Sequence, residues 1–271
     1  MISDPFEFTP GTTPLLVSMP HSGLQLTDAV ASGLTASALQ LADTDWFIPE
    51  LYSFLSDLGV GVIRANYSRY VLDLNRSLDD KPLYEGKVTG LFPDISFADD
   101  SLFLPGQEPD EDERERYKKQ IWRPYHRQLR DELDRLKAVH GNAMLFDAHS
   151  IAPRVPMLFD GRLPDFNFGS NNGASCRFGL ATQLEALTTA DGRFTCVTDG
   201  RFKGGFITRH FGQPAEGIET LQLELSQGTY LANSAFSAKR FDAYQLDPQK
   251  VIHVQPVLRH IIEHLLDALQ H

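Results

Sequence analysis

The sequence predicts an α/β protein with a largely parallel or mixed sheet. Short apolar runs such as residues 14–19 and 143–147 have the length and character of buried strands. They alternate with longer segments whose apolar residues recur at helical spacing, most clearly 109–139 and 251–269. Polar residues directly follow several of the apolar runs, and α/β sheets bind ligands beyond the carboxyl ends of their strands. We therefore expect a binding or catalytic site at that edge of the sheet.

Composition sets limits on the class of protein. The 271 residues are 42% hydrophobic, which is ample for one large domain, and we treat 1–271 as a single domain. No apolar run approaches the roughly 20 residues that span a bilayer, and the first residues lack the basic and apolar stretches of a signal peptide. We therefore expect a cytoplasmic protein whose two cysteines, Cys176 and Cys196, are free thiols.

The net charge of −11 argues against nucleic acids and membranes as partners, because both need a basic face. It leaves an anionic small molecule as a substrate, provided that basic residues gather at the site.

Each expected strand is a short apolar or β-branched segment. Strands are predicted at 14–19, 143–147 and 218–225, and in the last of these polar and apolar residues alternate. Further extended segments are predicted at 59–65, 70–74, 156–159 and 194–198.

The expected helices are identified by apolar spacing and by their end signals. A helix is predicted over 35–57 with a kink at Pro49, and another over 171–188. The segment 109–139 begins with an acidic run and should be kinked at Pro124. Its inward stripe comprises Ile121, Tyr125, Leu129, Leu133 and Leu136. In the last helix, 251–269, the inward residues are Val254, Leu258, Ile261, Ile262, Leu265 and Leu269. Residues 77–107 are predicted to form a long loop, and loops of this length are usually functional or mobile.

Two histidines stand at predicted strand ends and are candidates to bind a metal. His21 follows 14–19, and His149 follows 143–147. Asp147, two residues before His149, points the same way and can accept the ring N–H that does not face the metal. A catalytic zinc site commonly adds one carboxylate to two histidines and leaves a position for water. Asp43 and Asp45 are the candidates for that carboxylate; we expect one of them to be a ligand and prefer Asp45. The alternative is that His21 is a satisfied turn histidine, and that one of the two aspartates caps a turn while the other is solvated.

Glu224 is the candidate general base. On an alternating strand it shares a face with Gln222, and a carboxylate on a buried strand costs free energy unless it has a partner or a task. Activation of water is such a task. Glu219 is the competing candidate, and a solvated strand face is the alternative to any catalytic role.

Arginines are concentrated in two stretches, which suggests an anion pocket in an acidic chain. The alternative is surface pairing with Asp73, Asp79 and Asp80. His126, on the long helix, is expected to pack or to face solvent. The arginines are Arg64, Arg69, Arg76, Arg201 and Arg209.

The sequence contains no Gly-x-Ser-x-Gly elbow and no glycine-rich nucleotide loop, which argues against a serine hydrolase and against nucleotide cofactors.

In order and spacing, a set of motifs across about 14–230 resembles the N-formylglutamate amidohydrolases, also called N-formylglutamate deformylases. The motifs are Pro20-His21-Ser22-Gly23, Asp43-Thr44-Asp45, Ser68-Arg69-Tyr70, Asp73-Leu74-Asn75-Arg76, Asp147-Ala148-His149-Ser150, Gly204-Gly205-Phe206-Ile207-Thr208-Arg209-His210 and Gln222-Leu223-Glu224. The resemblance implies hydrolysis of N-formyl-L-glutamate to formate and L-glutamate, the last step of one bacterial route of histidine degradation. It also implies a three-layer α/β/α sandwich with a mixed sheet, of the phosphorylase/hydrolase-like kind and distantly similar to the zinc carboxypeptidases.

The carboxypeptidase pattern assigns expected roles. His21 and His149 would bind a divalent metal, which we expect to be zinc, and Glu224 would be the base. The residue three after His21 is Leu24 where carboxypeptidases have glutamate, so the carboxylate ligand must come from elsewhere, and Asp45 is our candidate.

The remaining expected roles concern the substrate. Asn75 and Arg76 would bind one carboxylate, with Arg209 or Arg69 at the other. Arg69 or His210 would help to stabilise the oxyanion. The partner is thus a small acidic N-acyl amino acid.

Two other functions remain open at this level. One is a related zinc amidohydrolase or carboxypeptidase-like enzyme that acts on another N-acyl amino acid. The other is a non-catalytic protein that binds a dicarboxylate. The sequence gives no indication of the oligomeric state.

Overall fold

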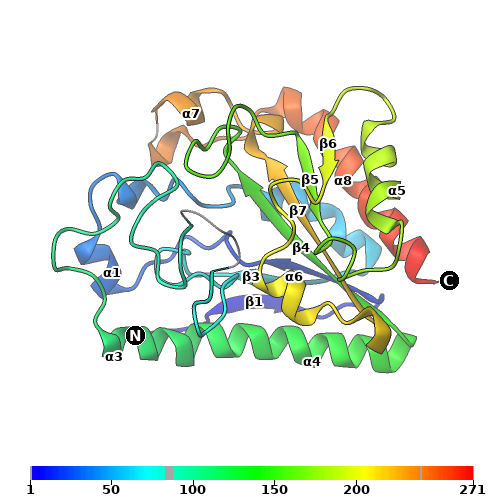
Figure 1. Ribbon diagram of the computed structural model, residues 1–271, viewed down its shortest axis with the longest axis horizontal. Coiled ribbons are helices and arrows are strands. Elements are labelled where there is room, and N and C mark those ends of the chain that lie inside the picture. Colours follow the sequence, from blue (N-terminus) through cyan, green and yellow to red (C-terminus); the bar gives the residue numbers. More distant parts are fainter. Residues whose placement is uncertain (1, 83–87, 239, 271) are drawn as a thin grey trace.

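The computed structural model describes residues 2–82, 88–238 and 240–270, and its centre is a seven-stranded sheet (Figure 1). The strand order is β1-β3-β2-β4-β7-β5-β6. The four strands from β3 to β7 in this order run parallel, whereas β1 is antiparallel to β3 and β5 is antiparallel to β7. The predicted mixed sheet is confirmed. The strands are β1 (Phe6–Thr9), β2 (Leu15–Met19), β3 (Gly61–Ala65), β4 (Ala143–Ile151), β5 (Phe166–Gly169), β6 (Cys196–Thr198) and β7 (Ile218–Ser226).

The central strands are the apolar runs of the sequence. Every residue of β2, β4 and β7 is buried, as expected for strands that are covered on both faces. β4 continues four residues beyond the predicted 143–147 and therefore includes both Asp147 and His149. It pairs with β7 over nine residues, which places His149 opposite Glu224 and Asp147 opposite Gln222.

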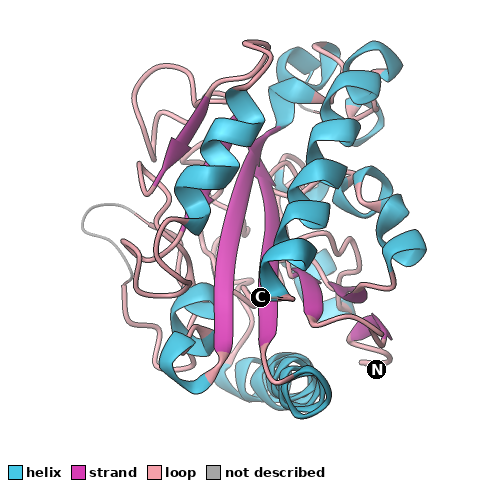
Figure 2. Ribbon diagram, turned by 90° about the vertical axis from the view of Figure 1, so that its right-hand side faces the viewer, coloured by secondary structure: helices cyan, strands magenta, loops and turns pink. Residues whose placement is uncertain are grey.

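Helices cover both faces of the sheet and make the predicted three-layer sandwich (Figures 1 and 2). On one face Tyr125 of α4 hydrogen-bonds Ser18 of β2, with 3.0 Å between the hydroxyl oxygens. On the other face Tyr52 packs against Phe146 of β4. The α-helices are α1 (Asp28–Gly33), α2 (Ile48–Leu51), α3 (Glu111–Tyr117), α4 (Arg123–His140), α5 (Leu180–Thr189), α6 (Phe206–Phe211), α7 (Ser234–Ala238) and α8 (Pro248–Leu269). The short 3₁₀ helices are η1 (Ala38–Gln40), η2 (Ser53–Leu58), η4 (Pro214–Glu216), η5 (Gln227–Thr229) and η6 (Phe241–Ala243), and η3 (Lys118–Trp122) is a π-helix.

The two long amphipathic helices follow the predicted pattern. All predicted inward residues of 109–139 and 251–269 are buried. Asp110 caps the first of these helices by accepting a hydrogen bond from the Glu113 N–H. The π-helix η3 joins α3 to α4 just before Pro124. A π-helical turn at this point accommodates the backbone hydrogen bond that proline cannot donate.

Three predicted elements are wrong. The segment 35–57 is not one helix but η1, α2 and most of η2. Leu41 and Phe47 adopt positive φ angles of 51° and 58°, which interrupt a helix. The predicted strands at 70–74 and 156–159 are turns. In the segment 70–74, the side chain of Asp73 accepts a hydrogen bond from the Asn75 N–H. Such a local bond competes with the backbone hydrogen bonds that would pair a strand with its neighbour.

Several elements lie outside the predictions. The predicted helix at 171–188 is a turn followed by α5, and β1, β5, α1 and α6 were not predicted. In the loop 77–107 the described residues contain no strand or helix, and its residues 83–87 lie outside the described residues. Cys176 and Cys196 are free thiols, as predicted. Among the described residues, no helix combines the length and the apolar character needed to cross a membrane.

Candidate active site

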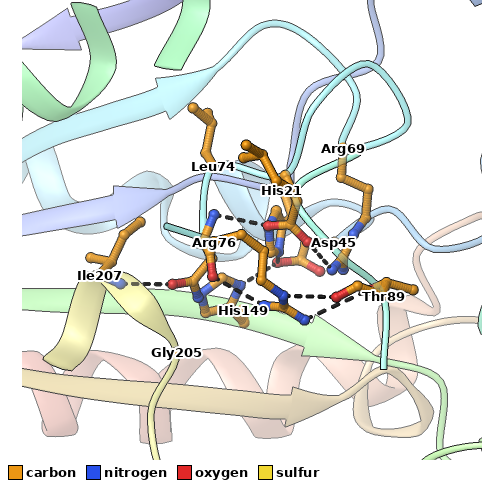
Figure 3. A network of polar contacts seen from close by, with 12 residues as sticks. His21, Asp45, Arg69, Leu74, Arg76, Thr89, His149, Gly205 and Ile207 are labelled. Atoms are coloured by element: carbon orange, nitrogen blue, oxygen red, sulfur yellow. Dashed lines mark hydrogen bonds and ion pairs between the residues drawn. The ribbon is translucent and has the colours of Figure 1, made fainter. Parts of the chain in front are cut away.

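His149 is the centre of a buried polar cluster at the carboxyl end of β4. Its Nε2 lies 2.9 Å from Oδ2 of Asp147, and its Nδ1 lies 3.0 Å from Oδ2 of Asp45. Because both ring nitrogens are in contact with carboxylates, the ring orientation is fixed (Figure 3).

His21 has the same arrangement. It stands just after β2, and its Nε2 lies 2.7 Å from Oδ1 of Asp73, while its Nδ1 lies 3.8 Å from Oδ2 of Asp45. The two imidazole rings are neighbours, with centroids 4.8 Å apart. Each histidine thus uses Nε2 for a carboxylate of its own and directs Nδ1 to the shared Asp45.

His21, Asp45 and His149 can hold a metal ion. One ligand atom from each of the three lies within 4.8 Å of the other two, and all three side chains are buried. Tetrahedral zinc keeps such atoms about 3.4 Å apart, so small movements would close the site. Two imidazoles and one carboxylate leave a fourth position for water. Asp73 and Asp147 complete the pattern, because a carboxylate on the far ring nitrogen is the usual support of a metal-binding histidine. The structure places Asp45, and not Asp43, in this group.

The electrostatics of the cluster suit a cation. Burial and then Arg69 lower the pKa of His21, so its ring is neutral and can offer a lone pair. Burial also disfavours charge on His149, but Asp147 and Asp45 outweigh it and raise the pKa well above its usual value. Those two carboxylates attract positive charge to the ring, and a divalent ion at Nδ1 would satisfy them in place of a proton.

Glu224 lies beside this group on β7, opposite His149, and lines the same cavity. Burial and the neighbouring Asp45 raise the pKa of Glu224, His149 and Arg69 oppose the shift, and the net result is a pKa of about 8. A carboxyl group with a pKa near neutrality is suited to exchange protons. The competitor Glu219 is engaged elsewhere: it accepts hydrogen bonds from Arg177 N and Nε at 2.6 and 2.7 Å.

Three arginines line the cavity. Arg69 pairs with Asp73 at 2.6 Å, and its guanidinium lies over the ring of Phe97. Arg76 donates from Nε to the carbonyl oxygen of Thr89 at 2.9 Å, and it also bonds the Asn75 carbonyl oxygen. Arg201 is the third arginine among the described residues of the lining. Thus a chain of net charge −11 places three guanidinium groups at this cavity, beside the carboxyl groups of Asp45 and Glu224.

Asn75 connects three parts of the site. Its Nδ2 lies 3.0 Å from Nε2 of His149 and donates to Oδ2 of Asp147 at 3.3 Å. Its Oδ1 accepts the N–H of Ile207, at the start of α6, at 2.8 Å. The backbone of Gly205 passes against the same amide, so closely that a Cβ there would lie 2.4 Å from Nδ2. The Asn75 side chain is therefore engaged within the protein while it lines the cavity (Figure 3 shows the Ile207 bond).

The structure does not bring every predicted site residue together. Arg209 and His210 are on α6 and do not line the cavity; Arg209 donates from Nε to Gly204 O, and exposed His210 stacks on Phe206. Asp43 accepts the backbone N–H of Phe97 at 2.9 Å and so holds the loop that covers Arg69.

Some site residues were not assigned by the sequence analysis. The sequence indicates Asp73 only as a surface partner for arginine, yet it is fully buried between His21 and Arg69. Its position in the Asp-x-Asn-Arg stretch was the available signal. Thr89 and Phe97 lie in the long loop and carry no pattern. His126 is buried and packs against Trp122, which is one of the two roles expected for it.

Comparison with known proteins places the chain in a family. The model of the N-formylglutamate amidohydrolases matches residues 13–231. The chain belongs to the N-formylglutamate amidohydrolase family. An N-formylglutamate deformylase of Pseudomonas putida is 51% identical over 259 residues, covering 96% of this chain and 94% of that protein. The corresponding protein of Pseudomonas aeruginosa is also 51% identical and covers 96% and 95%.

Solved structures share the fold. The crystal structure of an N-formylglutamate amidohydrolase from Ralstonia eutropha JMP134 superimposes with a TM-score of 0.80 at 21% identity, over 98% of both chains. A gene product from Agrobacterium tumefaciens gives a TM-score of 0.72 at 15% identity, over 99% of this chain and 97% of that one. The α/β/α sandwich predicted from the motifs is thereby confirmed as the fold of this amidohydrolase chain.

Proposed function

We propose that this chain is a metal-dependent N-formylglutamate deformylase, which hydrolyses N-formyl-L-glutamate to formate and L-glutamate. The observation that carries the proposal is the buried His21-Asp45-His149 group with Glu224 beside it, in a chain of the N-formylglutamate amidohydrolase family. The 51% identity to two N-formylglutamate deformylases supports the choice of substrate.

We infer that the metal is zinc, held by the Nδ1 atoms of both histidines and by Asp45. A bound zinc ion supplies a Lewis acid that acidifies water and polarises a carbonyl group. The buried carboxylates of Asp73 and Asp147 favour the tautomer of each ring that carries the proton on Nε2, which leaves the lone pair on Nδ1.

Glu224 is the proposed general base and then the general acid. It takes a proton from the attacking water and passes it to the amide nitrogen as the C–N bond breaks. A divalent ion nearby would lower the pKa of Glu224 from about 8 and so favour the carboxylate that this step needs. Arg69, buried beside the cluster, is the proposed oxyanion partner. His210 is left out of this role because it lies outside the cavity lining.

Recognition falls to the glutamate half, because formyl offers almost no surface. We propose that Arg76, with Asn75 beside it, binds one carboxylate. For the other carboxylate, Arg209 or Arg69 was expected; Arg201 replaces Arg209 in this role, because Arg201 lines the cavity and Arg209 does not. Guanidinium groups suit this task since they bind carboxylates with two parallel hydrogen bonds. We further infer a cytoplasmic enzyme of histidine degradation.

The test is formate release together with metal content. Protein purified without chelator should hold about one divalent ion per chain. It should release formate from N-formyl-L-glutamate faster than from N-acetyl or N-carbamoyl amino acids. Faster turnover of another acyl group would move the assignment to a related amidohydrolase. Dicarboxylate binding with no turnover in the metal-loaded protein would identify a binding protein instead.

A further inference from the structure

Gln222 is a buried polar residue that the proposed mechanism does not use. It lies on β7 two residues before Glu224, on the same face of the strand and opposite Asp147 in the register with β4. Its side chain is 4% exposed, and it lines the cavity. The exposure that it retains is therefore directed to the site.

The orientation of the Gln222 amide is determined by the backbone of Gly205. Oε1 accepts the Gly205 N–H at 2.8 Å. If the amide were flipped, its NH₂ group would face the Gly205 N–H, and neither of these two donors would have an acceptor. Oε1 must therefore face Gly205. Within the described part of the chain, Nε2 makes no hydrogen bond. The NH₂ group is thus a fixed donor at the wall of the cavity.

The position of this donor decides which substrate oxygen it meets. Two residues along a strand span about 6.6 Å, so Gln222 is offset by that length from Glu224, where the formyl carbon must react. In extended N-formylglutamate the side-chain carboxyl carbon is about 6 Å from the formyl carbon, whereas the α-carboxyl carbon is no more than about 4 Å away. The offset matches the side-chain carboxylate.

We propose that Gln222 is a specificity-determining residue that donates from Nε2 to the side-chain carboxylate of the substrate. This inference rests on the proposed function and deepens it. Because the donor is fixed at one distance from the base, it selects glutamate over the shorter aspartate. A substrate whose carboxylate is buried without this donor binds more weakly, because a buried polar group without a hydrogen-bond partner costs free energy.

The test uses Gln222→Glu, which exchanges only the donor. A glutamate oxygen can still accept the Gly205 N–H, while the other oxygen meets the substrate carboxylate with like charge. For N-formyl-L-glutamate, kcat/KM should fall roughly 30- to 1,000-fold, mainly through KM. N-formyl-L-glutamine should lose much less, because its side-chain amide can donate to the new carboxylate. N-formyl-L-isoglutamine, which keeps the side-chain carboxylate, should lose as much as the diacid.

Other outcomes would overturn the inference. Equal losses on all three substrates, or weaker metal binding in the variant, would mean that Gln222 supports Asp147 and not the substrate. If only N-formyl-L-isoglutamine lost less kcat/KM in Gln222→Glu, the Gln222 donor would be assigned to the α-carboxylate of the substrate. Should Gln222→Glu not fold, Gln222→Met, which removes the whole amide without adding charge, must show the same ranking of substrates, since loss of the Gly205 contact alone would affect all three equally. Gln227→Glu is the matched control. The Gln227 nitrogen is bonded to Thr44 O and Ser150 Oγ within the protein and is not available to a substrate, so this variant should not alter the ranking of the three substrates. Wild-type turnover of N-formylglutamate tests the proposed function separately.

Discussion

At the scale of single residues, the site is defined by carboxylates that hold imidazoles. Asp73 and Asp147 are the least exposed members of the cluster, and each contacts one histidine at Nε2. Neither carboxylate is among the proposed metal ligands, yet each favours the tautomer in which the other ring nitrogen offers its lone pair. The metal affinity should therefore depend on residues that do not touch the ion.

Asp147→Asn should bind zinc about 10- to 100-fold more weakly than the wild type, the usual effect of losing such a partner. Competition with a chromophoric chelator measures this. Asp247→Asn makes the same chemical change at the start of α8, where asparagine also caps well, and should leave zinc binding unchanged. Wild-type affinity in Asp147→Asn would remove Asp147 from the support of His149.

Glu224→Gln should keep its zinc and lose on the order of 10²–10⁴ in turnover, the range of a general acid–base contribution. Glu219→Gln is the control, because Glu219 lies on the same strand but is paired with Arg177. This variant should lower the free energy of unfolding and leave turnover close to that of the wild type. Stopped-flow or steady-state formate assays and metal analysis decide between them. Near-normal turnover in Glu224→Gln would show that another group is the base.

Most residues of this histidine–carboxylate cluster could be predicted from the sequence, but their contacts with one another could not. His21, His149 and Glu224 follow or end apolar runs, so their position at the sheet edge was predictable. The choice between Asp43 and Asp45 was not, because both lie in a turn and only the packing of distant segments decides which one meets the histidines. Asp73 was equally hidden, since pairing with Arg69 can occur on a surface or in a core.

At the scale of elements, the approach of α6 to the sheet depends on one glycine. Gly205→Ala would set a Cβ 2.4–2.6 Å from three atoms of the Asn75 amide, which cannot retreat without breaking its bonds to Asp147 and Ile207. We expect a loss of about 1–3 kcal/mol in unfolding free energy, typical of overpacking, together with reduced activity. Gly228→Ala, whose nearest contacts would be 3.4 Å, is the control for urea unfolding. Equal stability of the two variants would contradict this account.

α4 carries a pH-dependent element of stability. His126 stacks on Trp122 and donates from Nε2 to Leu74 O at 2.8 Å, and burial lowers its pKa to about 3. The unfolded chain, with a pKa near 6.5, takes up this proton first, so stability falls as the pH drops from about 6.5 towards 3.

At pH 5 this effect should cost about 2 kcal/mol relative to pH 7. His126→Phe keeps an aromatic ring and removes the titration, so its urea midpoint should change less between the two pH values. His253→Phe, at a histidine exposed on α8, is the control and should keep the wild-type pH dependence. An identical slope in wild type and His126→Phe would exclude His126 as the source.

The predictability of elements followed the physics that forms each one. β2, β4 and β7 are buried on both faces, so their apolar runs were sufficient. β1 and β5 are short, and β5 is a Phe-Asn-Phe-Gly segment that forms only because β7 offers it a partner. The break of 35–57 at Leu41 and Phe47 depends on left-handed backbone that nonglycine residues adopt only under tertiary constraint.

At the scale of the whole molecule, the proposed metal should stabilise the fold, because the three residues proposed to bind it lie in separate segments and come together only in the native state. At a free zinc concentration 100 times Kd, the gain is about 2.7 kcal/mol. For a chain of this size that corresponds to roughly 5–10 °C in Tm. Calorimetry with zinc and with chelator measures the difference, and His149→Ala should abolish it. An unchanged wild-type Tm would contradict a site formed only by folding.

Strand order was the part of the architecture least accessible from the sequence. Alternation of strands and helices indicated the sandwich, but nothing in the residues of β7 indicates that it inserts between β4 and β5, both of which precede it in the chain. Such pairing is decided by which edges remain available once the earlier strands have met.

That insertion has a consequence for biosynthesis. About 75 residues separate the end of β4 from the end of β7, so a ribosome working at roughly 5–20 residues per second needs about 4–15 s to supply the missing strand. Throughout that interval the nascent chain presents β4 with its longest pairing edge open, and an open apolar edge recruits other chains. The stretch of translation before Ser226 is therefore when we expect this protein to depend most on chaperones.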